Sequence, residues 1–318
     1  MLEKRAFPPL GDVSVLTIGG GGIGNVWGKE SEEERVATLR EAVESGINLI
    51  DVAPSYGRGG EAERIVGLAF GGHLPDGVLI STKCDLSNVP PDAIARTIDE
   101  SLAGSLSRMR RDTVDMLFLH NLIVPDALAG QVEGTPLGVF REFVRPAFER
   151  LVAAGTIRCW AISAFGVPSA IIDVLEDEPR LAAIQAVSNL LDAVGEMPYD
   201  EPSRPREIIA AATDRGVSVM GVRAVHAGAL TDAIDRELRD DHPLLADFRR
   251  AEPFRAIARE LGYSSAALAH RYALSMPGVT TLVLGVKHRA ELRECIEAAK
   301  AGPLSADIYA RLDALRTG

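Results

Sequence analysis

The sequence has few of the features that mark several classes of protein. Only three cysteines occur among its 318 residues, Cys84, Cys159 and Cys295, and their spacing fits no zinc motif. This scarcity favours a reducing compartment and argues against a disulfide framework. No apolar run reaches the ~20 residues of a membrane span, and the first residues contain no apolar core of signal-peptide length. We therefore expect a cytoplasmic protein.

Positive charge is also scarce. The chain carries 34 Lys and Arg against 45 Asp and Glu, a net charge of -11, and its pI is about 5.1. This balance argues against a broad surface for nucleic acid or an anionic membrane, although a local basic pocket for one nucleotide remains compatible with it. The apolar share of 47% and charged share of 25% are those of a folded globular protein.

A unit of helix, glycine and short apolar run recurs along the chain. Gly46, Gly77, Gly155, Gly216 and Gly278 each stand directly before such a run, as expected of a helix end followed by a buried strand. The expected strands are residues 15–19, 47–51, 78–83, 114–120, 157–163, 183–188, 217–222 and 281–285. Strands that alternate with helices pair in parallel, and eight of them close a (β/α)8 TIM barrel.

Helical periodicity fills the intervals between these strands. The first helix begins at Ser31, where Ser31 and Glu34 have capping-box spacing, and stops at Gly46. Further helices are expected at residues 61–70, 91–107, 139–154, 168–175, 204–215, 254–261, 264–275, 289–299 and 304–316. Residues 123–138 and 194–205 resist the pattern and are expected to be long loops on the catalytic face. We expect residues 1–318 to form a single barrel domain, because such barrels often have this length.

A glycine-rich motif offers a competing fold. Gly19, Gly21 and Gly24 fit G-x-G-x-x-G, and Asp51 ends the next strand where a Rossmann fold places a ribose-binding acid. That motif requires a helix to begin at its last glycine, whereas residues 25–30 are loop-like. Five further strand-helix units also follow, which is more than the three units of a nucleotide-binding half require. We therefore favour the barrel, in which these glycines let the backbone turn closely beneath a ligand.

Four polar side chains follow neighbouring strands. Asp51, Lys83 and His120 end the second, third and fourth strands, and Tyr56 follows Asp51 by one tight turn. In a barrel all four would share the C-terminal mouth. Asp51 would hold Lys83 ionised, the ammonium would favour ionisation of the Tyr56 phenol, and a neutral His120 would orient a carbonyl oxygen.

Two other interpretations of these residues remain open. A buried Asp51 and Lys83 ion pair could serve packing alone, with Tyr56 and His120 as hydrogen-bonded neighbours. Asp51, His120 and His226 could instead hold a metal ion, but Lys83 argues against a cation at the same place. We therefore expect no metal. Trp27, in the loop after the first strand, is expected either to line a substrate pocket or to pack over the mouth.

The chain resembles the aldo-keto reductase family over essentially its whole length. The resemblance lies in Gly46 to Gly57 with the following Glu61 and Gly67, in Ser81-Thr82-Lys83, and in Leu119-His120-Asn121. Residues 155–158 and 163–166 resemble the family's fifth-strand motif, and Gln185 with Asn189 resembles the sixth.

The resemblance implies a barrel that binds NADP or NAD across its mouth. Hydride would pass from the nicotinamide to a carbonyl while Tyr56 donates the proton, Asp51 and Lys83 tune Tyr56, and His120 orients the substrate. Ser163 and Gln185 would hold the nicotinamide carboxamide. The other implied cofactor contacts are Gly22, Asp51, Arg223, Gly228, Leu230, Gly285, Lys287, Glu291 and Cys295, with Trp27, Tyr56 and His120 toward the substrate.

Three positions depart from the family pattern. Ala164 stands where Asn is usual, and Cys295 replaces an Asn that commonly contacts adenine. Glu291 stands where Arg or Gln is common, and its carboxylate would repel a 2′-phosphate but could accept from a ribose hydroxyl. Lys287 or Arg289 could offset that repulsion. NADP therefore stays the first expectation and NAD the second.

Three functions follow from this pattern. The leading one is an NADPH-dependent reductase of aldehydes or ketones. The second is an NAD-dependent sugar or polyol dehydrogenase, which Glu291 supports. The third is a cofactor-binding regulatory or scaffold protein with low turnover, motivated by Ala164 and Cys295. The small-molecule substrate and the oligomeric state are not predicted, because long loops and not strand ends determine specificity.

Overall fold

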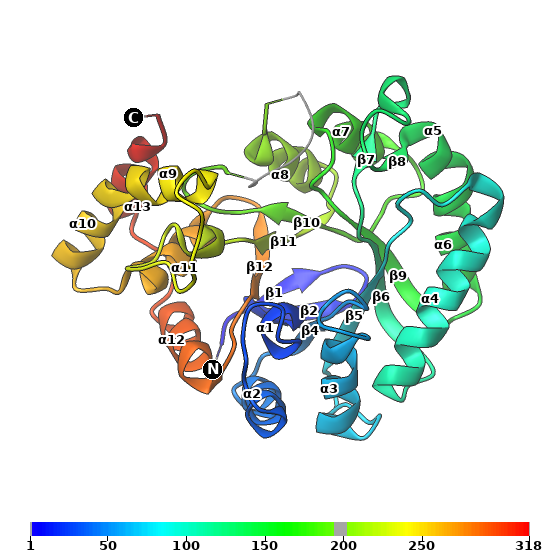
Figure 1. Cartoon of the computed structure of the whole chain (residues 1–318), viewed down its shortest axis with the longest axis horizontal. Helices are drawn as coiled ribbons and strands as arrows, with labels where there is room; N and C mark the ends of the chain where they lie inside the picture. Colours follow the sequence, from blue (N-terminus) through cyan, green and yellow to red (C-terminus); the bar gives the residue numbers. More distant parts are fainter. Residues whose placement is uncertain (1, 194–201, 318) are drawn as a thin grey trace.

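The computed structural model describes residues 2–193 and 202–317. Eight parallel strands form one closed barrel, which confirms the (β/α)8 prediction and excludes the Rossmann alternative (Figure 1). In chain order the strands are β3 (Leu16–Gly19), β4 (Leu49–Asp51), β5 (Leu79–Cys84), β6 (Val114–Leu119), β9 (Ile157–Ser163), β10 (Ala183–Val187), β11 (Ser218–Val222) and β12 (Val279–Leu284). Each predicted strand is present, with ends that differ by no more than two residues.

Helices surround the barrel and connect its strands. They are α2 (Glu32–Glu44), α3 (Glu61–Phe70), α4 (Ile94–Met109), α6 (Arg145–Ala153), α7 (Pro168–Glu176), α8 (Pro205–Asp214), α9 (Pro243–Arg250), α10 (Glu252–Leu261), α11 (Ser265–Ser275), α12 (Arg289–Lys300) and α13 (Ala306–Asp313). The 3-10 turn η5 (Ala314–Thr317) follows α13. None of the helices in the described ranges combines the length and apolar character needed to cross a membrane.

The local signals act as the sequence indicated. The Ser31 hydroxyl accepts the Glu34 amide N–H at 3.2 Å and thus caps α2. Gly46 then adopts φ +96°, a conformation that favours glycine, and the chain turns at once toward β4. The short connection places Asp51 at the carboxyl end of a buried strand.

The mouth differs from expectation at two segments. Residues Gly20–Ile23 form a short helix, α1, where a loop was expected, because consecutive glycines let this turn pass close to its neighbours. Residues 123–138 are not an open loop. The buried Ile123 and Val124 form β7, which pairs with β8 (Thr135–Pro136), and the 3-10 turn Asp126–Leu128 and the short helix α5 (Leu137–Val139) also lie there. The second predicted loop, 194–205, falls mostly outside the described residues.

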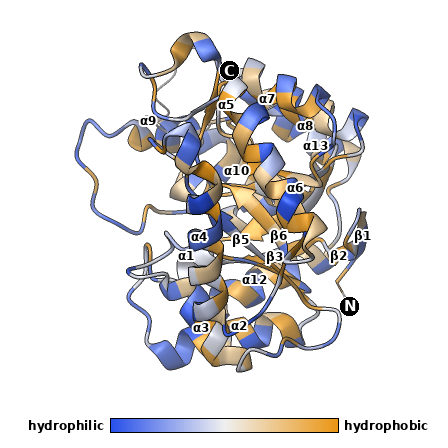
Figure 2. Ribbon diagram, turned by 90° about the vertical axis from the view of Figure 1, so that its right-hand side faces the viewer, coloured by the Kyte–Doolittle hydropathy of each residue, from blue (hydrophilic) through white to orange (hydrophobic). Residues whose placement is uncertain are grey.

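The N-terminal end of the barrel is closed by a hairpin that the sequence did not reveal. Strands β1 (Lys4–Phe7) and β2 (Gly11–Ser14) pair antiparallel. Their Phe7 and Val13 join interior strand residues such as Met116 and Phe118 in one buried apolar cluster. In Figure 2 this hairpin and α1 lie at opposite ends of the barrel strands. The hairpin end is therefore packed, and the polar strand ends face the opposite, open end.

Candidate active site

Asp51 is the centre of the polar group at the mouth. It is 1% exposed, at the end of β4. Its Oδ1 accepts from Lys83 Nζ at 2.6 Å and from Ser81 Oγ at 2.7 Å, and its Oδ2 accepts from Gln185 Nε2 at 2.9 Å. The carboxylate thus receives three donors, which is the compensation that a buried charge requires.

Lys83 is fully buried, yet its ammonium is well compensated. Besides Asp51, its Nζ donates to the Val52 carbonyl at 3.0 Å. It also lies 5.1 Å from the ring centroid of Tyr56 and 5.4 Å from that of Phe118. At such distances an aromatic ring adds a favourable electrostatic contact to a cation. Lys83 therefore connects the acid to the phenol, as predicted.

His120 completes the predicted quartet. Its ring meets the Tyr56 ring edge to face, with centroids 5.5 Å apart and planes at 82°. The His120 Nε2 lies 3.5 Å from the Tyr56 hydroxyl, and Nδ1 lies 3.4 Å from the hydroxyl of Ser55. The structure therefore brings Asp51, Tyr56, Lys83 and His120 together at one point.

Burial decides the protonation of the two rings. It raises the pKa of the Tyr56 phenol, and Asp51 acts in the same direction while Lys83 opposes them. Lys83 favours ionisation of the phenol as expected, but desolvation outweighs the ammonium, so the net pKa of Tyr56 is raised. Burial, assisted by Lys83, lowers the pKa of His120 to about 4. At neutral pH the site holds a neutral phenol beside a neutral imidazole.

Three residues support the quartet without having been singled out from the sequence. Ser81 is aligned with Asp51 across the paired strands β4 and β5. Two-residue alternation places it on the same interior face as Lys83, a signal that was readable. Gly20 is required for close packing, because an added Cβ would lie 2.9 Å from the Tyr56 ring. Ser55 gave no signal beyond its place before Tyr56.

A second polar pair lies at the ends of β9 and β10. Ser163 and Gln185 are neighbours in the strand register, and both are buried. The Ser163 hydroxyl has no hydrogen-bond partner among the described residues. A buried hydroxyl without a partner is uncommon and suits a site where a ligand supplies one. These two side chains thus fit the amide of a nicotinamide ring.

The segment after β11 has an unusual backbone. Arg223, His226 and Ala227 adopt φ of 59°, 43° and 50°, and Gly228 adopts 100°. The Arg223 side chain is exposed and makes no hydrogen bond or ion pair within residues 2–193 and 202–317. The buried His226 instead pairs with Asp247, its Nε2 lying 2.7 Å from Oδ2. Leu230 is wholly buried in the core.

The predicted adenosine end is rich in carboxylates. Lys287 Nζ lies 2.6 Å from Asp235 Oδ2 and 3.2 Å from Glu291 Oε1. The Glu291 Oε2 also accepts the Lys287 amide N–H at 2.8 Å. Arg289 is paired with Glu34 at 2.8 Å, beside a surface hollow of about 550 Å³. Both cations proposed to offset Glu291 are therefore already engaged.

Cys295, Gly22 and Gly285, which the resemblance places near the cofactor, each contact other parts of the chain. Cys295 is buried, with its Sγ 3.7 Å from His270 Nε2, so it faces a neighbouring helix. Gly22 packs against the eighth-strand segment, since an added Cβ would lie 1.8 Å from the Val286 carbonyl oxygen. Gly285 accepts a hydrogen bond from Trp27 through its carbonyl.

Trp27 is half exposed at the mouth. Its Nε1 donates to the Gly285 carbonyl at 3.1 Å, and its ring covers Gly21, where an added Cβ would lie 2.0 Å from the indole. The ring is thus fixed by contacts on one side and open on the other. This arrangement shows the expected packing over the mouth, while a role in lining a substrate pocket stays a prediction.

The metal interpretation receives no support. His226 is paired with Asp247, while Asp51 is paired with Lys83. Within residues 2–193 and 202–317, no group of three or more His, Cys, Asp or Glu side chains has an arrangement that could hold a metal ion.

Comparisons with known proteins agree with this geometry. A model of the aldo/keto reductase family matches residues 15–317. The chain is 26% identical over 310 residues to L-galactose dehydrogenase from Arabidopsis thaliana, covering 93% of this chain and 88% of that protein. It is 28% identical over 254 residues to the NADH-specific methylglyoxal reductase of Escherichia coli K12, covering 72% and 70%. An aldo-keto reductase from Klebsiella pneumoniae, solved in complex with NADPH, has the same fold, with a TM-score of 0.73, 22% identity and coverage of 99% and 95%.

Proposed function

The chain belongs to the aldo/keto reductase family, and we propose that it reduces an aldehyde or ketone to an alcohol with a nicotinamide cofactor. The observation that carries this proposal is the contact of Tyr56 with both Lys83 and His120 at the mouth of the barrel. In this proposal residues 1–318 act as one barrel domain on a small carbonyl or sugar substrate.

Tyr56 is the proton donor in this proposal. Burial raises the pKa of its phenol, so the group carries a proton at neutral pH and can deliver it to a developing alkoxide. The phenolate left behind would lie beside the Lys83 ammonium, which favours that charge. Asp51 pairs with Lys83 at 2.6 Å and so fixes the ammonium in place. The ion pair therefore stabilises the product of proton transfer and not the starting phenol.

His120 orients the substrate in this proposal. With a pKa lowered to about 4, the ring is neutral at physiological pH and adds no positive charge beside Lys83. Its Nε2 lies 3.5 Å from the Tyr56 hydroxyl. A carbonyl oxygen placed between these two groups would accept a hydrogen bond from each. The imidazole would thus hold the carbonyl where Tyr56 can protonate it.

The cofactor would meet the barrel at Ser163 and Gln185. When bound, the nicotinamide would supply hydride for reduction or accept it for oxidation. Ser163 offers an unpartnered hydroxyl, and Gln185 is held in place through Asp51. We assign the remaining cofactor contacts as expected from the sequence, to Gly22, Arg223, Gly228, Leu230, Gly285, Lys287 and Glu291. Cys295, also expected there, is left out of this assignment because its buried thiol faces His270 on the neighbouring helix. NADP is the proposed cofactor, supported by the NADPH complex of the Klebsiella pneumoniae protein.

One observation favours a second candidate, an NAD-dependent sugar or polyol dehydrogenase. Asp235 and Glu291 both hold Lys287, so a 2′-phosphate at this place would meet two carboxylates and a neutralised cation. Arabidopsis L-galactose dehydrogenase provides a sugar-oxidising relative. In this direction Tyr56 would accept the proton. We further propose a cytoplasmic location, which the three free, buried cysteines support.

Tyr56→Phe tests the assignment of the proton donor. We expect kcat to fall by about 10²- to 10⁴-fold, because a general acid contributes on this order, while the cofactor Kd measured by fluorescence quenching stays unchanged. Tyr263→Phe is the matched control, since Tyr263 is an exposed tyrosine outside the site. Near-normal turnover of Tyr56→Phe over a panel of carbonyls and sugars would contradict the proposal. If neither the unmodified protein nor the Tyr263→Phe control binds a nicotinamide cofactor, the cofactor assignment is contradicted.

A further inference from the structure

The turn that follows β10 is closed by one buried amide. Asn189 is fully buried, and its Oδ1 accepts the amide N–H groups of Leu191 at 3.0 Å and Ala193 at 3.3 Å. Its Nδ2 donates to the carbonyls of Ala193 at 3.1 Å and Arg223 at 3.2 Å. The last bond crosses to the residue that follows β11. The shape of this turn therefore determines where the Arg223 backbone lies.

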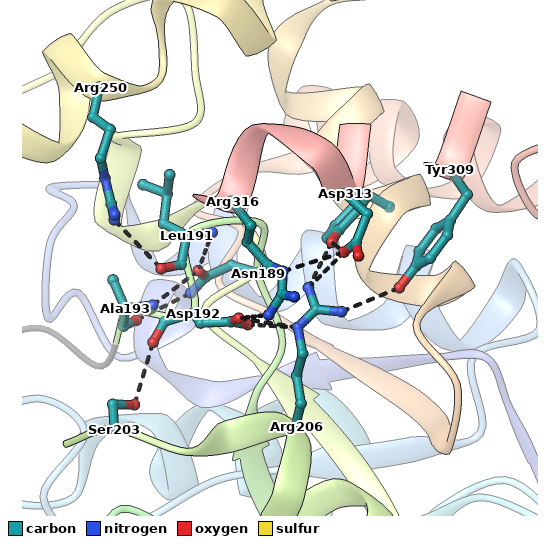
Figure 3. Close-up of polar contacts among 11 residues, drawn as sticks. Asn189, Leu191, Asp192, Ala193, Ser203, Arg206, Arg250, Tyr309, Asp313 and Arg316 are labelled. Carbon is teal, nitrogen blue, oxygen red and sulfur yellow. Dashed lines mark hydrogen bonds and ion pairs between the residues drawn. The ribbon is translucent and has the colours of Figure 1, made fainter. Parts of the chain in front are cut away.

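Asp192 occupies a strained position in the same turn. Its φ is 49°, in the left-handed region that residues other than glycine seldom adopt. Two arginines hold it there: both carboxylate oxygens lie 3.0 Å from Arg206 Nε, and Arg316 Nη1 donates to Oδ2 at 2.6 Å (Figure 3). Without these cations the segment would lose the contacts that offset its strain.

The two arginines belong to a ring of alternating charge, the Asp192 clamp, formed by Asp192, Arg206, Asp313 and Arg316. Arg206 Nη2 lies 3.0 Å from Asp313 Oδ1, and Arg316 Nε lies 3.5 Å from the same oxygen. Figure 3 shows these side chains converging from the mouth turn, α8, α13 and η5. All four are half-buried, with side-chain exposures of 19% to 31%. A network of this kind is less screened than an isolated surface pair.

The C-terminal side of the clamp is firmly packed. Arg206 donates to the Tyr272 hydroxyl at 2.6 Å and to the Tyr309 hydroxyl at 3.4 Å. The rings of Tyr272 and Tyr309 stack with centroids 5.1 Å apart and planes at 10°. The Tyr272 hydroxyl also donates to Asp313 at 2.5 Å. The clamp thus joins the Asn189 turn at the mouth to a firmly packed C-terminal segment.

We propose that the Asp192 clamp is a positioning device through which the C-terminal segment fixes the Asn189 turn and, with it, Arg223 at the mouth of the barrel. This inference rests on the proposed function, because the Arg223 guanidinium, which has no partner among residues 2–193 and 202–317, would meet the phosphates of a nicotinamide cofactor. Asp192 and Arg316 touch no substrate or reacting atom. Their effect passes through Asn189 to Arg223, and it concerns cofactor binding and not proton transfer.

The test measures binding of ADP-ribose, a probe that carries the two phosphates but no nicotinamide. By calorimetry, Asp192→Asn and Arg316→Gln should each weaken ADP-ribose binding by about tenfold, a coupling of ordinary size, and the double variant should be no worse than either alone. With saturating cofactor, kcat should stay within about twofold, since KM and not chemistry is affected. Arg316→Lys, which keeps the charge, should restore most of the affinity.

Arg311→Gln is the matched control. Arg311 lies on α13 and pairs at 2.7 Å with Glu260, away from the mouth turn. Arg311→Gln should leave ADP-ribose binding unchanged, whatever its effect on the melting temperature. Clamp variants that lower the melting temperature as Arg311→Gln does, yet bind ADP-ribose normally, would show a merely structural role and overturn the inference.

Arg223→Ala separates this inference from the proposed function. If Arg223→Ala weakens ADP-ribose binding but the clamp variants do not, only the positioning role is wrong. If Arg223→Ala binds ADP-ribose as the unmodified protein does, the placement of the cofactor phosphates is wrong, and the clamp inference falls with it. Weaker binding in Arg223→Ala and in both clamp variants, with rescue by Arg316→Lys, is the expected result.

Discussion

Replacing Lys83 by methionine should destabilise the protein by about 3 kcal/mol, at the lower end of the range for breaking a buried ion pair. Lys83 and Asp51 are 0% and 1% exposed and 2.6 Å apart. The substitution removes the cation but leaves Asp51 with two neutral donors, Ser81 Oγ at 2.7 Å and Gln185 Nε2 at 2.9 Å. These two hydrogen bonds reduce the cost of leaving the Asp51 carboxylate buried without a cation, but they do not replace the lost charge.

The same reasoning predicts that removing both charges is less harmful than removing one. In Asp51→Asn with Lys83→Met no buried charge is left without a partner. We expect the double variant to be more stable than Lys83→Met alone by about 2 kcal/mol, since a buried pair replaced as a whole is often close to neutral. Neither variant should retain normal turnover, so stability and activity separate.

Urea unfolding followed by circular dichroism measures these free energies. Lys300→Met is the control, because Lys300 pairs with Glu297 at 2.9 Å on the surface and should contribute less than about 1 kcal/mol. If Lys83→Met costs no more than Lys300→Met, the Asp51 carboxylate does not depend on its partner as argued. If the double variant is as unstable as the sum of its single substitutions, the two side chains are not coupled.

Two further predictions concern the rest of the site. Burial lowers the pKa of His120 to about 4. Below about pH 6.5 the unfolded state therefore binds more protons at this residue than the folded state does. As the pH falls from 7 to 5, His120 should lower the free energy of unfolding by about 2 kcal/mol. Urea titrations at both pH values should show a smaller loss in His120→Gln; an equal loss in both proteins would refute the assignment. Glu291→Gln, which frees Lys287 of one carboxylate, should tighten NADPH binding by about tenfold and leave NADH binding within about twofold. Fluorescence quenching with exposed Glu297→Gln as control checks this, and an unchanged NADPH affinity would place the 2′-phosphate elsewhere.

The barrel and the quartet could be predicted because each depends on short stretches of sequence. A glycine before an apolar run gives a helix end and a strand, and a polar residue at the end of such a run lies at the mouth of a parallel barrel. Asp51, Lys83 and His120 all carry this local signal. The hairpin β1 to β2 was not predicted, since its two strands are only four residues long and Pro8 and Pro9 stand between them.

The net direction of the Tyr56 pKa could not be predicted in the same way. Residue types indicated that Lys83 would favour ionisation of the phenol, but they did not show how deeply the ring would be buried. Likewise the Asp192 clamp joins residues more than 100 positions apart, from Asp192 to Arg316. Its members are ordinary charged residues in the sequence, and only the packing of α8 and α13 brings them together.

The structure connects the proton-transfer residues with the residues proposed to hold the nicotinamide. The sequence showed no link between these two groups. β4 and β10 lie on opposite sides of the closed barrel, four strands apart in its order. The bond from Gln185 to Asp51 crosses that interior, while Lys83 and Ser81 bind the other carboxylate oxygen. Asp51 therefore fixes Lys83, which faces Tyr56, and Gln185, which neighbours Ser163, with one carboxylate. Loss of its charge should disturb both sides at once, so a defect in cofactor binding in Asp51→Asn does not count against its part in proton transfer.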